Sequence, residues 1–163
     1  MILICYDGSQ DARAAIERSG ELLDGQPATV LTVWEPFIHA LTHSAGGLGP
    51  IAGLADLEEI DNAIGRQAEQ RAAEGAELAR QAGLQSRPRI CTQETTIADA
   101  ILSEAQTVGA EAIVMGSRGL TGLKSLLLGS VSHAVIQHAD RTVILVPSVA
   151  YLAQAQSRAS APS

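Results

Sequence analysis

Three glycines and a serine late in the chain have the types and the spacing to bind an anion. Gly116 and Gly119 follow the apolar run 112–115, and after nine further residues Gly129 and Ser130 open a predicted helix. Glycine lets a backbone approach a ligand closely, and the first amides of a helix have no partner within that helix. These amides carry the positive end of the helix dipole. The segment therefore predicts a phosphate site where a strand, a loop and a helix meet.

The spacing of these glycines differs from that of two well-known phosphate loops. A Walker A loop has a glycine, four residues and then Gly-Lys-Ser or Gly-Lys-Thr, and no segment of this chain has that pattern. The dinucleotide fingerprint begins with Gly-x-Gly after the first strand, whereas Gly116, Gly119 and Gly122 follow the fourth predicted strand. A glycine-rich loop also occurs where only a tight turn is needed. The loop alone leaves both nucleotide binding and simple turn geometry open.

Apolar runs alternate with helical patterns along the rest of the chain. Strands are expected at 2–6, 28–34, 88–94, 112–115 and 142–146, and helices at 10–23, 54–81, about 95–108 and 130–138. The segment 37–53 contains four glycines and one proline and is expected to be a long loop. This alternation specifies a parallel sheet with helices on both faces. We therefore expect one α/β domain over 1–148, an open parallel five-stranded sheet, and a flexible tail over 149–163.

An acidic turn follows the first predicted strand. In parallel sheets, ligands bind beyond the carboxyl ends of the strands, so Asp7 and the Gly116 loop are expected to face one crevice. Simpler roles are equally compatible with these residue types. Asp7 could shape its turn or cap the next helix, Ser130 could cap its own helix, and Met115 and Val33 could be ordinary core residues.

Composition and charge narrow the classes of protein. The 163 residues carry a net charge of −7, which disfavours sequence-independent nucleic-acid binding. No apolar run approaches the roughly 18 residues that cross a bilayer, and the first residues lack a signal-peptide pattern. Two cysteines are too few for a disulfide scaffold, so reduced thiols and a cytoplasmic location are expected. His39 and His43 lack a nearby third ligand, so no metal site formed by the protein alone is expected.

Several motifs together resemble the universal stress protein family. They are the pattern Gly116-Ser-Arg-Gly119, nine residues and Gly129-Ser130, its flanking strands 113–115 and 143–147, and the first strand and turn at 2–9. The resemblance extends from residue 1 to about 148, and it indicates the subgroup of the family that binds ATP. It implies an adenine nucleotide alpha hydrolase-like fold, with strand order 3-2-1-4-5.

The resemblance also implies roles for individual residues. Asp7 would accept hydrogen bonds from ribose hydroxyls, Val33 would contact adenine, and Met115 and Gly116 would lie along the ribose and base. The ten residues expected to bind nucleotide are Asp7, Val33, Met115, Gly116, Arg118, Gly119, Gly129, Ser130, Val131 and Ser132.

The phosphates of ATP would lie at the glycine loop. Gly119 and the amides of Gly129 and Ser130 would hold them, while the hydroxyls of Ser130 and Ser132 would add donors or a ligand to Mg²⁺. Arg118 could supply charge for hydrolysis, but the loop contains no evident group to orient water. Binding with slow or absent turnover is therefore expected, and no catalytic residue is assigned.

The last predicted strand implies a partner. Residues 143–146 form an apolar strand at the expected edge of the sheet, and family members dimerise through this strand, so we expect a two-fold homodimer. The resemblance implies an ATP-binding regulator of a stress response with an unidentified protein partner. Two alternatives stay open: an interaction protein whose pocket stays empty, and a slow ATPase.

Overall fold

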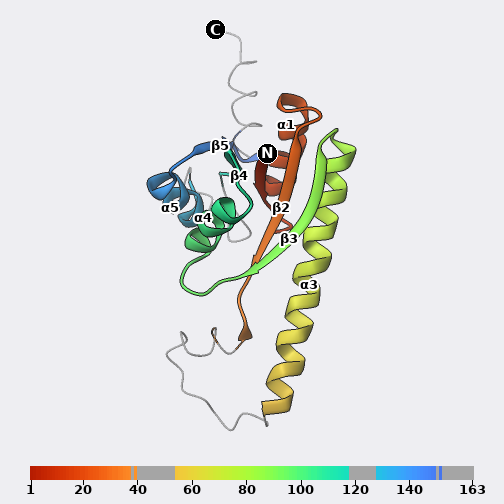
Figure 1. Ribbon diagram of the computed structural model, residues 1–163, viewed down its shortest axis with the longest axis vertical. Coiled ribbons are helices and arrows are strands. Elements are labelled where there is room, and N and C mark those ends of the chain that lie inside the picture. The colour runs from red at the N-terminus through yellow and green to blue at the C-terminus, as the bar shows by residue number, and fades with distance from the viewer. Residues whose placement is uncertain (38, 40–53, 118–127, 150, 152–163) are drawn as a thin grey trace.

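A parallel sheet of five strands forms the centre of the described structure, and helices cover both of its faces (Figure 1). The computed structural model describes residues 1–37, 39, 54–117, 128–149 and 151. Its strands run in the order β3-β2-β1-β4-β5, which confirms the predicted fold. Their bounds are β1 Ile2–Cys5, β2 Pro27–Trp34, β3 Gln85–Thr92, β4 Ala112–Gly116 and β5 Thr142–Val146.

Successive side chains along each strand point to opposite faces, and this alternation builds two cores. Ile2 and Ile4 of β1 face α1 (Gln10–Leu22) and α3 (Leu54–Gln81). Leu3, between them, faces α4 (Ile97–Thr107) and α5 (Ser130–His138). All three are buried, as in a parallel sheet that is covered on both faces. The carboxyl end of β1 therefore lies between two helical layers.

Local capping sets where two of the helices begin. The Ser9 hydroxyl accepts a hydrogen bond of 3.1 Å from the Ala12 amide and caps α1. The Thr96 hydroxyl caps α4 in the same way and accepts a hydrogen bond of 3.0 Å from the Asp99 amide. These caps place the start of each helix directly after the turn or loop that follows a strand.

The edge strand β3 begins earlier than predicted, at Gln85 instead of Pro88. Pro88 lies within the strand, in register with Val30 of β2. An edge strand tolerates proline because one of its sides has no neighbouring strand to receive an amide hydrogen. The prediction of an edge strand from Pro88 is therefore confirmed, and the prediction that the strand begins at Pro88 is wrong.

Small residues bring α3 close to the sheet. Ala68, Ala72, Ala76 and Ala79 are buried against it at helical spacing. Ile60, an apolar residue of the same helix, is 38% exposed, because the amino-terminal half of α3 extends past the carboxyl edge of the sheet (Figure 1). Within the described residues, none of the helices has both the length and the apolarity to cross a membrane.

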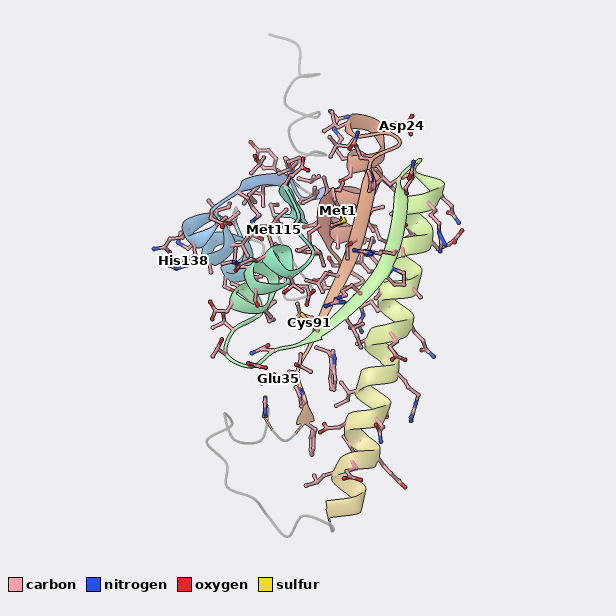
Figure 2. All side chains as sticks on the ribbon, viewed as in Figure 1. Met1, Asp24, Glu35, Cys91, Met115 and His138 are labelled. Atoms are coloured by element: carbon pink, nitrogen blue, oxygen red, sulfur yellow. The ribbon has the colours of Figure 1, made fainter. Side chains whose placement is uncertain are left out.

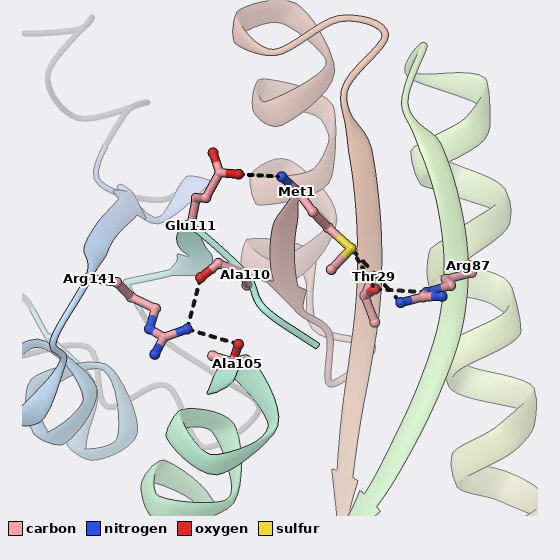
Figure 3. A network of polar contacts seen from close by, with 7 residues as sticks. All are labelled: Met1, Thr29, Arg87, Ala105, Ala110, Glu111 and Arg141. Carbon is pink, nitrogen blue, oxygen red and sulfur yellow. Dashed lines mark hydrogen bonds and ion pairs between the residues drawn. The ribbon is translucent and has the colours of Figure 1, made fainter. Parts of the chain in front are cut away.

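Polar contacts close the opposite, amino edge of the sheet (Figure 3). The Arg141 side chain, just before β5, donates from Nη1 to the carbonyl oxygens of Ala105 and Ala110, both at 2.8 Å. The amino terminus of Met1 lies 3.3 Å from the Glu111 carboxylate. These contacts tie the end of α4 to the starts of β1, β4 and β5.

Candidate functional site

A cavity of about 330 Å³ lies at the carboxyl edge of the sheet, between the two helical layers. Strands β1, β2 and β4 and helices α1, α3, α4 and α5 contribute residues to its lining. Two of the ten predicted site residues, Arg118 and Gly119, lie outside the described residues. The structure brings the other eight together around this cavity: Asp7, Val33, Met115, Gly116, Gly129, Ser130, Val131 and Ser132.

Gly116 ends β4 where α1 passes very close to the strand. A Cβ atom at this position would lie 2.9 Å from the carbonyl oxygen of Asp11 in α1. Its φ is not positive, unlike that of Gly8 at +85°. The need for glycine here comes from this close approach, and not from a left-handed backbone.

Backbone contacts join the two ends of the glycine loop. The Ser117 amide donates to the Val146 carbonyl at 2.8 Å, and the Gly129 amide donates to the Ser117 carbonyl at 2.7 Å. The buried Ser132 hydroxyl donates to the carbonyl of Gly116 at 3.0 Å. The end of β4 and the start of α5 therefore form one unit, and the Ser132 proton is used within it.

The amino terminus of α5 opens onto the cavity. Gly129 is the N-cap residue, with φ −73° and ψ 157°, and Ser130 is the first helical residue. The alternative in which Ser130 caps its own helix is therefore wrong. Glycine has no side chain, so the N-cap offers no acceptor of its own to the first amides of α5, and these amides favour an anion.

Asp7 lies at the end of β1, in the turn that leads into α1. Its Oδ1 accepts a hydrogen bond of 2.9 Å from the amide of Ser9, the residue that caps α1. Asp7 also lines the cavity. The Asp7 side chain therefore both stabilises the turn and lines the site.

One half of the cavity is apolar. Leu31, Val33 and Met115 contribute to it from the sheet, and Ile97 and Ile101 contribute from α4. Ile97 is 39% exposed, which is high for a large apolar residue, so a bound flat group would cover it. Figure 2 labels Met115, which belongs to the core on the α4 side of the sheet.

Both cysteines are free thiols on this side of the sheet. Burial raises the pKa of Cys5 to about 12 and that of Cys91 to about 11. Cys5 lines the cavity, and its thiol is neutral at physiological pH. The sulfur therefore adds no charge to the apolar half.

Metal-ligating side chains do not cluster in the part of the chain that the structure describes, where no group of three or more His, Cys, Asp or Glu could hold an ion. Of the histidine pair considered above, His43 lies outside the described residues. His39 places its Nδ1 3.4 Å from the carbonyl oxygen of Gln93.

Comparison with known proteins decides the family. The model of the universal stress protein family matches residues 1–147. The chain belongs to this family. It is 28% identical over 150 residues to universal stress protein YxiE of Bacillus subtilis (strain 168). That match covers 89% of this chain and 97% of the relative. It is also 33% identical over 147 residues to the universal stress protein in QAH/OAS sulfhydrylase 3'region of Thermus aquaticus. That match covers 89% of this chain and 96% of the relative.

Solved structures agree with the universal stress protein fold. The structure of the protein MJ0577 matches with a TM-score of 0.70 and 23% identity, over 89% of this chain and 93% of that one. At this identity the likeness shows the fold alone, the Rossmann-like adenine nucleotide alpha hydrolase fold.

Several residues lining the site of this universal stress protein were not predicted from sequence. Those on the strands, on α1 and on α4 are Cys5, Ala12, Leu31, Ile97 and Ile101. Tyr6 directly follows β1, and Arg71 comes from α3. The apolar residues fall within predicted strands and helices, and the sequence does not show which of them face the crevice. Arg71 precedes the buried Ala72, and nothing in the local sequence distinguishes it from a surface arginine.

Proposed function

We propose that this universal stress protein binds an adenine nucleotide, specifically ATP, in the cavity at the carboxyl edge of the sheet. Occupancy of the site would regulate a protein partner in the cytoplasm during stress. One observation carries the proposal: a single cavity joins an apolar slot to the glycine-capped amino terminus of α5. An apolar base and a charged phosphate need this combination.

Complexes of structural neighbours support an adenine nucleotide as the ligand. The universal stress protein of Archaeoglobus fulgidus was solved with dAMP (22% identity, TM-score 0.57, 88% of this chain and 94% of that one). A family member from Arabidopsis thaliana was solved with AMP (16% identity, TM-score 0.59, coverage 92% and 93%). A further universal stress protein was solved with cAMP (22% identity, TM-score 0.53, coverage 90% and 94%). The three ligands share adenine, a ribose or deoxyribose and one phosphate.

The lining residues suit the parts of such a ligand. The base would lie in the apolar half beside Val33 and Met115, and the ribose would lie beside Asp7. The first amides of α5 and the exposed Ser130 hydroxyl would bind phosphate, with Gly119 and Arg118 completing the loop. The glycine spacing of the ATP-binding subgroup is the reason for proposing a triphosphate, with Mg²⁺ bound through the phosphates and Ser130.

Binding, with at most slow hydrolysis, is the activity that we propose. Among the described residues that line the cavity, Asp7 is the sole carboxylate, and it accepts a hydrogen bond from the Ser9 amide in its own turn. Fast hydrolysis needs a group that orients the attacking water. A bound nucleotide would therefore stay unhydrolysed while it occupies the site.

Titration calorimetry with ATP and Mg²⁺ tests the proposal. We expect saturable binding of ATP, weaker binding of GTP, and a higher melting temperature at millimolar ATP. The Gly119→Val variant should bind ATP more weakly, because a side chain there obstructs the approach of phosphate to the backbone. Absence of both heat and thermal shift at millimolar ATP would rule out a nucleotide-binding function.

We also propose that two copies of the chain pair through β5. This strand lies at the edge of the sheet and pairs with β4 alone in the described structure. Its residues Val143, Ile144 and Leu145 are only partly buried. An apolar edge of this kind favours pairing with a second strand.

A further inference from the structure

Arg71 reaches the cavity because α3 packs unusually close to the end of β1. At Gly75, one helical turn after Arg71, a Cβ atom would lie 2.6 Å from the Tyr6 ring. The Arg71 side chain consequently passes along the turn that follows β1. Its Nε lies 3.4 Å from where a Cβ of Gly8 would be, and the residue lines the cavity.

In the part of the chain that the structure describes, the Arg71 guanidinium has no acidic partner within ion-pair distance. Two other arginines close to α3 do have one: Arg13 pairs with Glu74 and Arg80 pairs with Glu77. Among the described residues, no ion pair includes Arg71. A partly buried guanidinium thus lines the cavity without forming an ion pair in the described structure, and Asp7 is the one described carboxylate in the same lining.

A guanidinium in this position is suited to bind an anion. Its planar set of N–H donors matches the oxygens of a phosphate, and arginine stays charged at any physiological pH. It enters the cavity from α3, whereas the first amides of α5 enter from the opposite helical layer. The cavity therefore offers two separate anion-binding elements, one of side-chain donors and one of backbone donors.

We infer that Arg71 binds a phosphate oxygen of the nucleotide and makes the site select nucleotides over nucleosides. This inference rests on the proposed function, since it assigns a residue to the same cavity. The apolar half and Asp7 recognise the base and the ribose, which nucleosides share. Arg71 recognises the charge that only nucleotides carry.

The experiment compares adenosine, AMP and ATP as ligands of the full chain. The variants are Arg71→Gln, Arg71→Lys and, as a control, Arg66→Gln, which removes an exposed charge from the same helix away from the cavity. We expect Arg71→Gln to weaken AMP or ATP binding by roughly ten- to a hundredfold and to leave adenosine binding unchanged. Arg71→Lys should lose part of that affinity, and Arg66→Gln should lose almost none.

The outcomes separate this inference from the proposed function. Wild-type protein that binds none of the three ligands overturns both. Wild-type protein that binds nucleotides, with Arg71→Gln unaffected or equally weakened for adenosine and ATP, overturns the role of Arg71 alone. A melting curve of each variant without ligand shows that it is folded before its affinity is compared.

Discussion

The Ser132 hydroxyl donates a hydrogen bond of 3.0 Å to the carbonyl oxygen of Gly116, and this contact joins the first turn of α5 to the last residue of β4. Both groups are buried. The bond holds the amino terminus of α5 at the carboxyl edge of the sheet, where the cavity opens. The geometry of the proposed phosphate site therefore depends on Ser132, although its hydroxyl proton is donated to a carbonyl of the protein and not to a ligand.

Replacing Ser132 should affect stability, whereas replacing Ser130 should affect binding. Ser132→Ala leaves a buried carbonyl without its donor, so we expect the free energy of unfolding in urea to fall by about 1–2 kcal/mol. Ser130 is exposed and heads the same helix. Ser130→Ala should change stability by less than about 0.5 kcal/mol, while weakening ATP binding. A stable Ser132→Ala variant would contradict the structural role of that bond.

Two glycines of α3 should respond in opposite directions to the same substitution. At Gly75 an added Cβ would lie 2.6 Å from Tyr6 and 2.9 Å from a methyl of Val30, so Gly75→Ala is expected to cost about 1–3 kcal/mol. At Gly65 the nearest atoms belong to Trp34 at 3.7 Å, an ordinary contact. Gly65→Ala should stabilise the protein by up to about 1 kcal/mol through helix propensity. Denaturant unfolding measures both, and equal effects at the two positions would refute the close approach of α3 to β1.

The buried thiols predict a loss of stability in alkali. Burial raises the pKa of Cys5 to about 12 and that of Cys91 to about 11, from an ordinary value of 9.0. Above pH 9 the unfolded chain releases these protons while the native protein retains them, so the free energy of unfolding falls as pH rises. Below pH 9 the thiols contribute no pH dependence.

The decrease for each thiol is at most about 1.4 kcal/mol per pH unit within its window. Urea unfolding at several pH values, in wild type and in a Cys5→Ala/Cys91→Ala variant, isolates this contribution from that of other groups. The variant should show the smaller slope above pH 9. Identical slopes would mean that the thiols titrate normally in the native protein.

A single proline should separate the proposed dimer. The Val146 carbonyl accepts from Ser117 on the β4 side, so by alternation the amide of Val143 points outward. Val143→Pro removes this outward donor and keeps the ladder to β4. Light scattering should give twice the 16.9 kDa chain mass for wild type and for Val143→Thr, and the mass of a single chain for Val143→Pro. A monomeric wild type would exclude pairing through β5.

Much of this fold could be predicted because its signals are local. Short apolar runs alternating with helical stripes predicted the order of strands and helices, and the glycine spacing indicated the family. The errors have tertiary causes. A large apolar residue of a helix is expected to be buried, but Ile60 of α3 is partly exposed, because that part of the helix passes beyond the sheet. Pro88 lies within β3, because the edge position of the strand tolerates it.

The sequence by itself determined the strand-and-helix alternation, the glycine loop and Asp7 at a strand end, because each depends on residues that are near one another in the chain. Only the tertiary structure decided that Ile97 and Ile101 form a wall of the cavity and that Arg71 enters it. These placements follow from how α3 and α4 pack on the sheet. The distance between α3 and β1 is set by the contact of Gly75 with Tyr6, two residues far apart in sequence, and no local pattern reveals such a contact.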